Sequence, residues 1–264
     1  MPSLNIVRRG RGEPMVLLHG IGGELCVWEP TLEALAGHLD VIAVDLPGFG
    51  HSPPLPDGTA PTAAALATAV TELMDELGIE SAHLAGNSLG GWIALELGKT
   101  ERARSVTALC PAGLWSAPLD PEGAPAPGGT QRTARALRPL LPLLMLSRRV
   151  RRLALARVVA HPERVPRSAA IRMVRSYARA TAYDATNVAM RQSHFTGASH
   201  IRVPLTVAFG ERDRLIRPAR LPGARSLILP DCGHIPMFDD PALVTRLLLE
   251  TAGTYESSYS CGIR

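Results

Sequence analysis

Ser88 stands at the centre of Gly86-Asn87-Ser88-Leu89-Gly90, a G-x-S-x-G pentapeptide between an apolar run and a helix-like segment. Such a pentapeptide is typical of a sharp strand-to-helix turn, in which only small residues fit two positions before and after the serine. The turn exposes the serine hydroxyl, and the first amides of the following helix face the same point. The alternative is a glycine-rich turn whose serine only caps the helix. The strand and helix expected on either side favour a nucleophile.

A serine hydroxyl is a weak nucleophile until a base removes its proton. His234, in LPDCGHIPMFDDP, follows the last expected strand and precedes the last expected helix. This places it in a loop at the carboxyl end of a strand, where catalytic groups of open α/β sheets gather. A surface-loop histidine is the alternative interpretation. His19 lies at another strand end, and we expect it to brace a loop.

A catalytic histidine needs an acceptor on its second ring nitrogen. Asp213, in VAFGERDRLI, follows the strand before the one that leads to His234. Glu211 is the competing carboxylate, and a solvated turn carboxylate is the alternative. The chain order Ser88, Asp213, His234 is the one expected when a triad is built on the strand ends of an α/β-hydrolase sheet.

The segment HGIGG, His19 to Gly23, directly follows the first strong strand. Its glycines allow backbone amides to approach a reacting carbonyl oxygen. We expect the amide of Ile21, or alternatively that of Gly22, to pair with the amide of Leu89 as an oxyanion hole. Phosphate binding is disfavoured, because the chain has neither G-x-x-x-x-G-K-[ST] nor a helix-opening G-x-G-x-x-G.

Together these segments resemble the α/β-hydrolase superfamily, in its esterase/lipase-like branch with a helical cap. The resemblance implies Ser88 as nucleophile, His234 as base, Asp213 as acid and the amides of Ile21 and Leu89 as oxyanion hole, with no metal or organic cofactor. The dehalogenase and epoxide-hydrolase branches carry aspartate at the elbow, so the serine argues against them. The matching segments follow the family's order over residues 14–250: HGIGG, DLPGFGHS, GNSLGG, GERD and CGHIPMFDDP.

The connection between Asp213 and His234 departs from the family pattern. The two residues are 21 positions apart, where the family commonly carries a fuller helix. The segment RPARLPGA leaves room for about one turn, because proline and glycine break helices. From the sequence it is an open question whether this short connection displaces Asp213 or loosens this edge of the sheet.

The hydrophobic pattern predicts the elements that position these residues. Apolar runs that alternate with helical segments indicate an α/β fold, with a mainly parallel sheet and helices on both faces. The pattern breaks between Pro111 and about Val203, which predicts a helical cap. We expect core segments at 1–113 and 201–254, a cap or lid at 114–200 and a flexible tail at 255–264. The expected strands lie in 14–20, 39–45, 81–87, 104–110, 204–210 and 225–230, and the expected helices in 61–79, 88–99 and 241–253.

Composition bounds the location and the partners. The 264 residues are 46% hydrophobic and 20% charged, with no window of about 18 apolar residues. The four cysteines lack CxxC or zinc-like spacing, and the N-terminus lacks a signal core. We therefore expect a cytoplasmic protein without a transmembrane segment. Its net charge of +4 does not indicate a nucleic-acid partner.

These observations favour a serine hydrolase that cleaves an apolar, ester-like small molecule through an acyl-enzyme. Three other reactions fit the same scaffold: carbon–carbon bond hydrolysis, perhydrolysis and a biosynthetic cyclisation. A non-catalytic ligand receptor is a further alternative.

Residues 138–159 interleave apolar residues with arginines, as in a helix on an anionic membrane surface. We prefer a cap helix with its apolar side on the pocket, because Pro139 and Pro142 interrupt its start.

Overall fold

The computed structural model describes residues 3–119 and 129–254. They form a seven-stranded sheet in the order β1-β3-β2-β4-β5-β6-β7. Strand β1 runs antiparallel to β3, and every other neighbouring pair is parallel. The carboxyl ends of β2 to β7 therefore meet at one edge. The strands are β1 (Ile6–Arg9), β2 (Pro14–Leu18), β3 (Asp40–Val44), β4 (Ala82–Asn87), β5 (Ala103–Leu109), β6 (Leu205–Gly210) and β7 (Arg225–Leu229).

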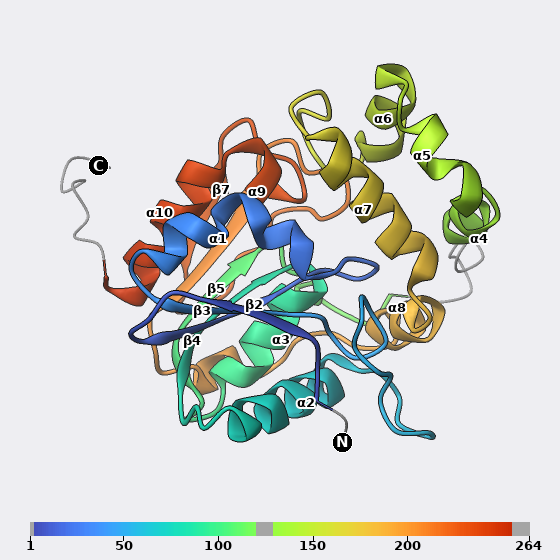
Figure 1. The fold of residues 1–264 in the computed structure, drawn as a ribbon. Coiled ribbons are helices and arrows are strands. Elements are labelled where there is room, and N and C mark those ends of the chain that lie inside the picture. Colours follow the sequence, from blue (N-terminus) through green and yellow to red (C-terminus); the bar gives the residue numbers. More distant parts are fainter. Residues whose placement is uncertain (1–2, 120–128, 255–264) are drawn as a thin grey trace.

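Helices cover both faces of the sheet (Figure 1). Helices α2 and α3 pack on one face, and α1 and α10 pack on the other. The central strands alternate between these cores: Val16 and Leu18 face α2 and α3, while Met15 and Leu17 face the opposite side. Outside residues 110–204 the helices are η1 (Leu25–Trp28), α1 (Glu29–Ala36), α2 (Ala63–Glu76), α3 (Leu89–Gly98), α9 (Pro236–Asp239) and α10 (Pro241–Ala252).

The observed elements confirm the predicted fold class. All six expected strands and all three expected helices are present, with ends shifted by a few residues. Strand β1 and helix α1 were not predicted. The four residues of β1 are only half-buried or exposed and end in two arginines, so they carry no buried-strand pattern. Helix α1 follows η1 directly and contains a proline near its start.

The regular elements in the described part of the segment between β5 and β6 are all helices, joined by turns and irregular chain. Its helices α7 and α8 lie over the loops that follow β2 and β3. The Ser176 hydroxyl donates to the Gly22 carbonyl over 3.3 Å, and the Thr181 hydroxyl donates to Gly48 at the same distance. The helices are α4 (Gly129–Ala136), η3 (Arg138–Leu140), α5 (Leu141–Leu144), α6 (Arg148–Leu155), α7 (Arg167–Arg179), α8 (Tyr183–Arg191) and η4 (Ala198–His200).

This helical insertion corresponds to the segment expected to form a cap, whose division into domains at 113 and 200 stays a prediction. The tail expected at 255–264 lies outside the described residues. In the part of the chain that is described, no helix has the length and apolarity to cross a membrane. Cys26, Cys110 and Cys232 are free and buried, while Cys261 lies outside the described ranges.

The two glycines of the pentapeptide have no room for a side chain. A Cβ at Gly86 would overlap the Gly90 carbonyl, and a Cβ at Gly90 would overlap the Leu18 carbonyl. We expect Gly86→Ala to lower the free energy of unfolding by about 3 kcal/mol, because backbone must move to accept it. Gly37→Ala is the matched control: its φ of −66° suits alanine, and its Cβ would meet the Ala34 carbonyl at 3.5 Å. Urea unfolding of both variants tests this, and equal stabilities would contradict it.

Candidate active site

Ser88 occupies a strained backbone conformation between β4 and α3. Its φ is 56° and its ψ is −115°, a region that residues with a Cβ rarely adopt. The turn is held because the Ser88 amide donates to the Leu109 carbonyl over 2.9 Å, and the Ser88 carbonyl accepts from Trp92 and Ala112. The residue is buried, and its side chain supplies no cap bond to α3. A capping role therefore does not explain the serine.

Asn87 fixes the turn to the loop that carries His234. Its side-chain amide donates to the His234 carbonyl over 2.7 Å and to the Leu109 carbonyl over 3.2 Å. Asn87 is 2% exposed, so both bonds are shielded from water. Sequence analysis missed this role, because the variable position of G-x-S-x-G gives no signal that its side chain reaches a residue 147 positions away.

His234 and Asp213 form the pair expected from the sequence. The His234 Nδ1 lies 2.8 Å from the Asp213 Oδ2. Because Asp213 accepts at Nδ1, the Nε2 atom lies on the opposite side of the ring and is free of this bond. The competing carboxylate, Glu211, instead accepts from the Asp231 amide over 2.9 Å.

The short connection leaves the Asp213 carboxylate within hydrogen-bond distance of His234, which answers the question that the sequence left open. The Asp213 Oδ1 accepts from the amides of Leu215 and Ile216 over 2.7 and 3.0 Å. These local bonds fix the carboxylate without a helix after it, and residues 211–224 form turns and extended chain. Strand β7 still pairs with β6 over its whole length.

Two opposing effects act on the Asp213 carboxylate. Burial by itself raises its pKa, but the His234 hydrogen bond and charge and the two amide donors outweigh burial. The pKa of Asp213 is therefore lowered from its ordinary value. The carboxylate is ionised at neutral pH, as an acceptor for an imidazolium must be.

Cys110 completes a compact cluster with this pair. Ligand atoms of Cys110, Asp213 and His234 lie within 4.8 Å of one another, the arrangement that a metal site would need. Burial raises the pKa of the Cys110 thiol well above its ordinary value, and the charge of Asp213 raises it further. The thiol is therefore protonated, and a metal that bound here would have to displace its proton. The sulfur instead accepts from the Gly210 amide over 3.4 Å.

The loop after β2 lies against Ser88. A Cβ at Gly20 would stand 3.1 Å from the Ser88 Cβ, and Gly22 has a φ of 73° in a turn closed by the Gly23 amide and the Gly20 carbonyl. Among the described residues, the amides of Ile21 and Leu89 have no hydrogen-bond partner. Both are therefore available to an oxyanion.

His19 and Asp45 hold this loop in place. The pKa of His19 is lowered by burial, so the ring is neutral. Its Nε2 accepts from the Leu46 amide over 3.0 Å, and its Nδ1 donates to the Gly20 carbonyl over 2.7 Å. The Asp45 carboxylate accepts from the amides of Leu25 and His51. The expected bracing role of His19 agrees with these bonds, while Asp45 was recognised only as part of a motif.

Asp239 ties the His234 loop to the helical insertion. Its carboxylate accepts from the amides of Ala160, His161 and Gly233 over 2.8–3.0 Å. The Ile235 amide also donates to the Val158 carbonyl over 2.7 Å. The segment before α7 therefore helps to set the position of His234, which no sequence pattern indicated.

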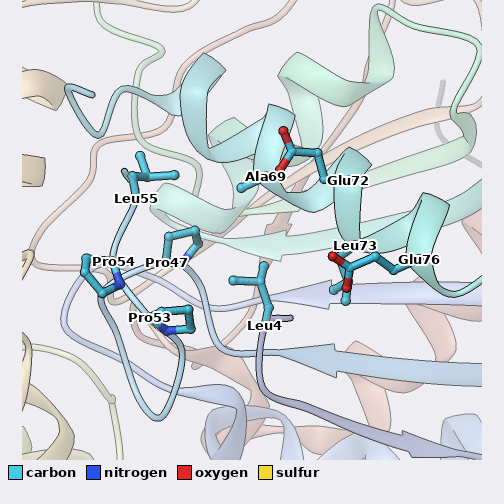
Figure 2. A pocket seen from close by; sticks show the side chains of 9 residues that line it. All are labelled: Leu4, Pro47, Pro53, Pro54, Leu55, Ala69, Glu72, Leu73 and Glu76. Carbon is cyan, nitrogen blue, oxygen red and sulfur yellow. The ribbon is translucent and has the colours of Figure 1, made fainter. Parts of the chain in front are cut away.

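A separate shallow hollow lies between α2 and the loop after β3 (Figure 2). It is lined by Leu4, by prolines of that loop and by Leu55, with Glu72 and Glu76 of α2 at its side. It contains none of the candidate catalytic residues. Those candidate residues instead follow strands β4, β6 and β7 at the carboxyl edge of the sheet.

The family follows from this fold and site together with sequence comparison. The profile of the "Alpha/beta hydrolase family" matches residues 15–247, most of the chain. The protein therefore belongs to the alpha/beta hydrolase family and is an enzyme of the hydrolase class.

Similar proteins within this family have different reported activities. "Epoxide hydrolase EphH" of Mycobacterium tuberculosis is 34% identical over 71% of this chain and 93% of its own length. A "Pimeloyl-[acyl-carrier protein] methyl ester esterase" of Aeromonas salmonicida is 38% identical, over 39% of this chain and 38% of its own. Among solved structures, a thermophilic esterase from Thermogutta terrifontis superposes with a TM-score of 0.72 at 24% identity, covering 94% of this chain and 92% of that one.

The Asp213–His234 pair makes stability depend on pH. Because the folded-state pKa of Asp213 is lowered, the unfolded state binds its proton first as the pH falls. The contribution is present above the unfolded pKa of about 3.9 and is lost as the pH falls through the lower folded value. We expect Asp213→Asn to remove this part of the acid-side slope. Urea unfolding of both proteins between pH 6 and pH 3 tests this. Equal acid-side slopes of unfolding free energy against pH in the variant and in wild type would contradict it.

Proposed function

We propose that this enzyme is a serine hydrolase of ester-like acyl substrates. The observation that carries the proposal is a strained elbow at Ser88 whose neighbour Asn87 bonds to the loop bearing His234, which pairs with Asp213 over 2.8 Å. The shared chemistry of this arrangement is attack on a carbonyl by a serine that an adjacent base activates.

The proposed mechanism assigns one task to each group. His234 takes the proton from the Ser88 hydroxyl as Oγ attacks the carbonyl carbon, and Asp213 stabilises the imidazolium that results. The amides of Ile21 and Leu89 donate to the oxyanion. The imidazolium then protonates the leaving alkoxide, which departs as the tetrahedral intermediate collapses to an acyl-enzyme. Water, deprotonated by His234, hydrolyses the acyl-enzyme and restores Ser88.

Epoxide hydrolysis is the second candidate, since a relative 34% identical to this chain bears that name. The serine disfavours a covalent route to it. A serine that opened an epoxide would be left as an alkyl ether, which has no carbonyl for water to attack. An acyl-enzyme is an ester and is hydrolysed. An epoxide substrate would therefore need water activated directly by His234, without Ser88.

The helical insertion is proposed to determine which substrates the enzyme accepts. Its α7 and α8 lie over the oxyanion loop, where a Cβ at Gly22 would meet the rings of Tyr177 and Tyr183. The two rings pack edge to face with centroids 5.0 Å apart. An apolar acyl or alcohol group suits these surroundings.

Removal of Ser88 tests the proposed nucleophile. We expect p-nitrophenyl ester hydrolysis to fall by about 10⁶-fold in Ser88→Ala and by about 10⁴-fold in Asp213→Asn. Esters of increasing acyl length would size the pocket. Full ester turnover in Ser88→Ala would defeat the proposal, and retained turnover of styrene oxide in that variant would favour epoxide hydrolysis by activated water.

Asn87 is proposed as the residue that positions His234. We expect Asn87→Ala to lower kcat by about 10²-fold with a smaller change in KM, because the base is misplaced while the pocket remains. Thr31→Ala is the matched control, since the Thr31 hydroxyl is also buried and donates to a backbone carbonyl, that of Trp28. Both variants should lose about 1–2 kcal/mol of stability. Equal kcat values in the two variants would contradict the positioning role.

A further inference from the structure

The outer helices of the insertion carry an unusual concentration of exposed leucines. Eight large hydrophobic side chains are exposed among the described residues, and five of them lie between positions 137 and 153. Leu143 is 66% exposed and Leu153 is 79% exposed. Four of the five recur every third residue: Leu137 follows α4, Leu140 lies in η3, Leu143 lies in α5 and Leu146 follows α5. The five are Leu137, Leu140, Leu143, Leu146 and Leu153.

The same helices are strongly basic. Residues 129–162 contain eight arginines and neither aspartate nor glutamate. The segment 114–200 has a formal charge of +10, although the whole chain has only +4. Exposed arginines flank the leucines at positions 135, 138, 148, 149 and 152, and no carboxylate of the described residues forms an ion pair with them.

The arginines also gather around a hollow. Arg135 and Arg138, with Arg175 and Arg179 of α7, line a depression that also includes Pro139. Four arginines that line one depression suit the phosphate of an anionic headgroup.

These helices are the part of the molecule farthest from the sheet. Figure 1 shows α4, α5 and α6 as an outer layer, with α7 between them and the sheet. Most of their packing within the described chain is on α7 and on one another, while Leu155 of α6 belongs to the core cluster that includes Met15 and Leu17. The five leucines are therefore not shielded by the core domain. The sequence-based interpretation, in which the apolar side of this segment lies on a pocket, does not hold for them.

We propose that α4 to α6 form a docking surface for an anionic phospholipid bilayer, with the leucines in the interface and the arginines on the headgroups. Interfacial binding of this kind adds buried apolar area to attraction by anionic lipid. A second copy of this chain is a poorer occupant. A two-fold interface would place the arginine cluster of one copy against the same cluster of the other, and the like charges would repel. The proposal is independent of the proposed function, since binding is measured without substrate.

Vesicle binding of the full chain tests this. We expect the protein to sediment with equimolar phosphatidylcholine–phosphatidylglycerol vesicles, to bind phosphatidylcholine vesicles far more weakly, and to be released by salt. The partition coefficient should fall about 30-fold in Arg148→Gln/Arg149→Gln, at about 1 kcal/mol per cation, and at least about tenfold in Leu143→Ser/Leu153→Ser.

Matched control variants show whether a loss of vesicle binding is specific to this surface or follows from any loss of charge or exposed apolar area. Arg11→Gln/Arg246→Gln removes two exposed arginines elsewhere, and Ile228→Ser removes an exposed apolar side chain from β7. Neither should change binding. Circular dichroism checks the fold of each variant.

Four results would overturn the proposal. The first is no binding by folded wild type, and the second is equal loss in the controls. The third is release by inorganic phosphate beyond that of chloride at equal ionic strength, which would make the hollow a soluble-anion site. The fourth is a dimer that light scattering detects and that Leu143→Ser/Leu153→Ser dissolves.

Discussion

The catalytic edge of this enzyme depends on one steric constraint, the close approach of β4, α3 and β2 around Ser88. Backbone of Gly90 lies against Gly86 and against the end of β2, with no space for a Cβ at either glycine. Because the chain must reverse direction there within a few atoms, Ser88 takes a positive φ. The packed backbone on both sides keeps this strained conformation in place.

Buried polar side chains hold loops that are far away in the sequence in fixed positions around this turn. Asn87 reaches the His234 loop, Asp239 joins the same loop to residues 160 and 161, and Asp45 accepts from the amides of Leu25 and His51 in the loops after β2 and β3. Each of these side chains hydrogen-bonds to backbone amides or carbonyls of another segment. The site is thus held largely by side-chain to backbone bonds, which fix geometry without requiring particular neighbouring side chains.

Sequence patterns predicted the strands and the three groups Ser88, Asp213 and His234, because buried parallel strands are continuous apolar runs and these groups sit at their ends. They predicted less where structure depends on long-range contacts. The half-exposed strand β1 has no apolar pattern, and the roles of Asn87 and Asp239 require partners 147 and 79 residues away. The effect of the short chain after Asp213 was left open for a related reason: two local amide bonds support the carboxylate there, and no sequence pattern indicates them.

Cys110 makes the region around His234 open to chemical observation. Its thiol is buried against the Asp213–His234 pair, and burial keeps it protonated and shielded, so a thiol reagent reaches it only when the sheet edge opens. Burial likewise raises the pKa of the Cys26 thiol, and it raises that of Cys232 to about 12. The rate at which each sulfur is alkylated therefore reports local opening: Cys110 and Cys232 follow the loop that bears the base, while Cys26 follows η1 on a different part of the fold.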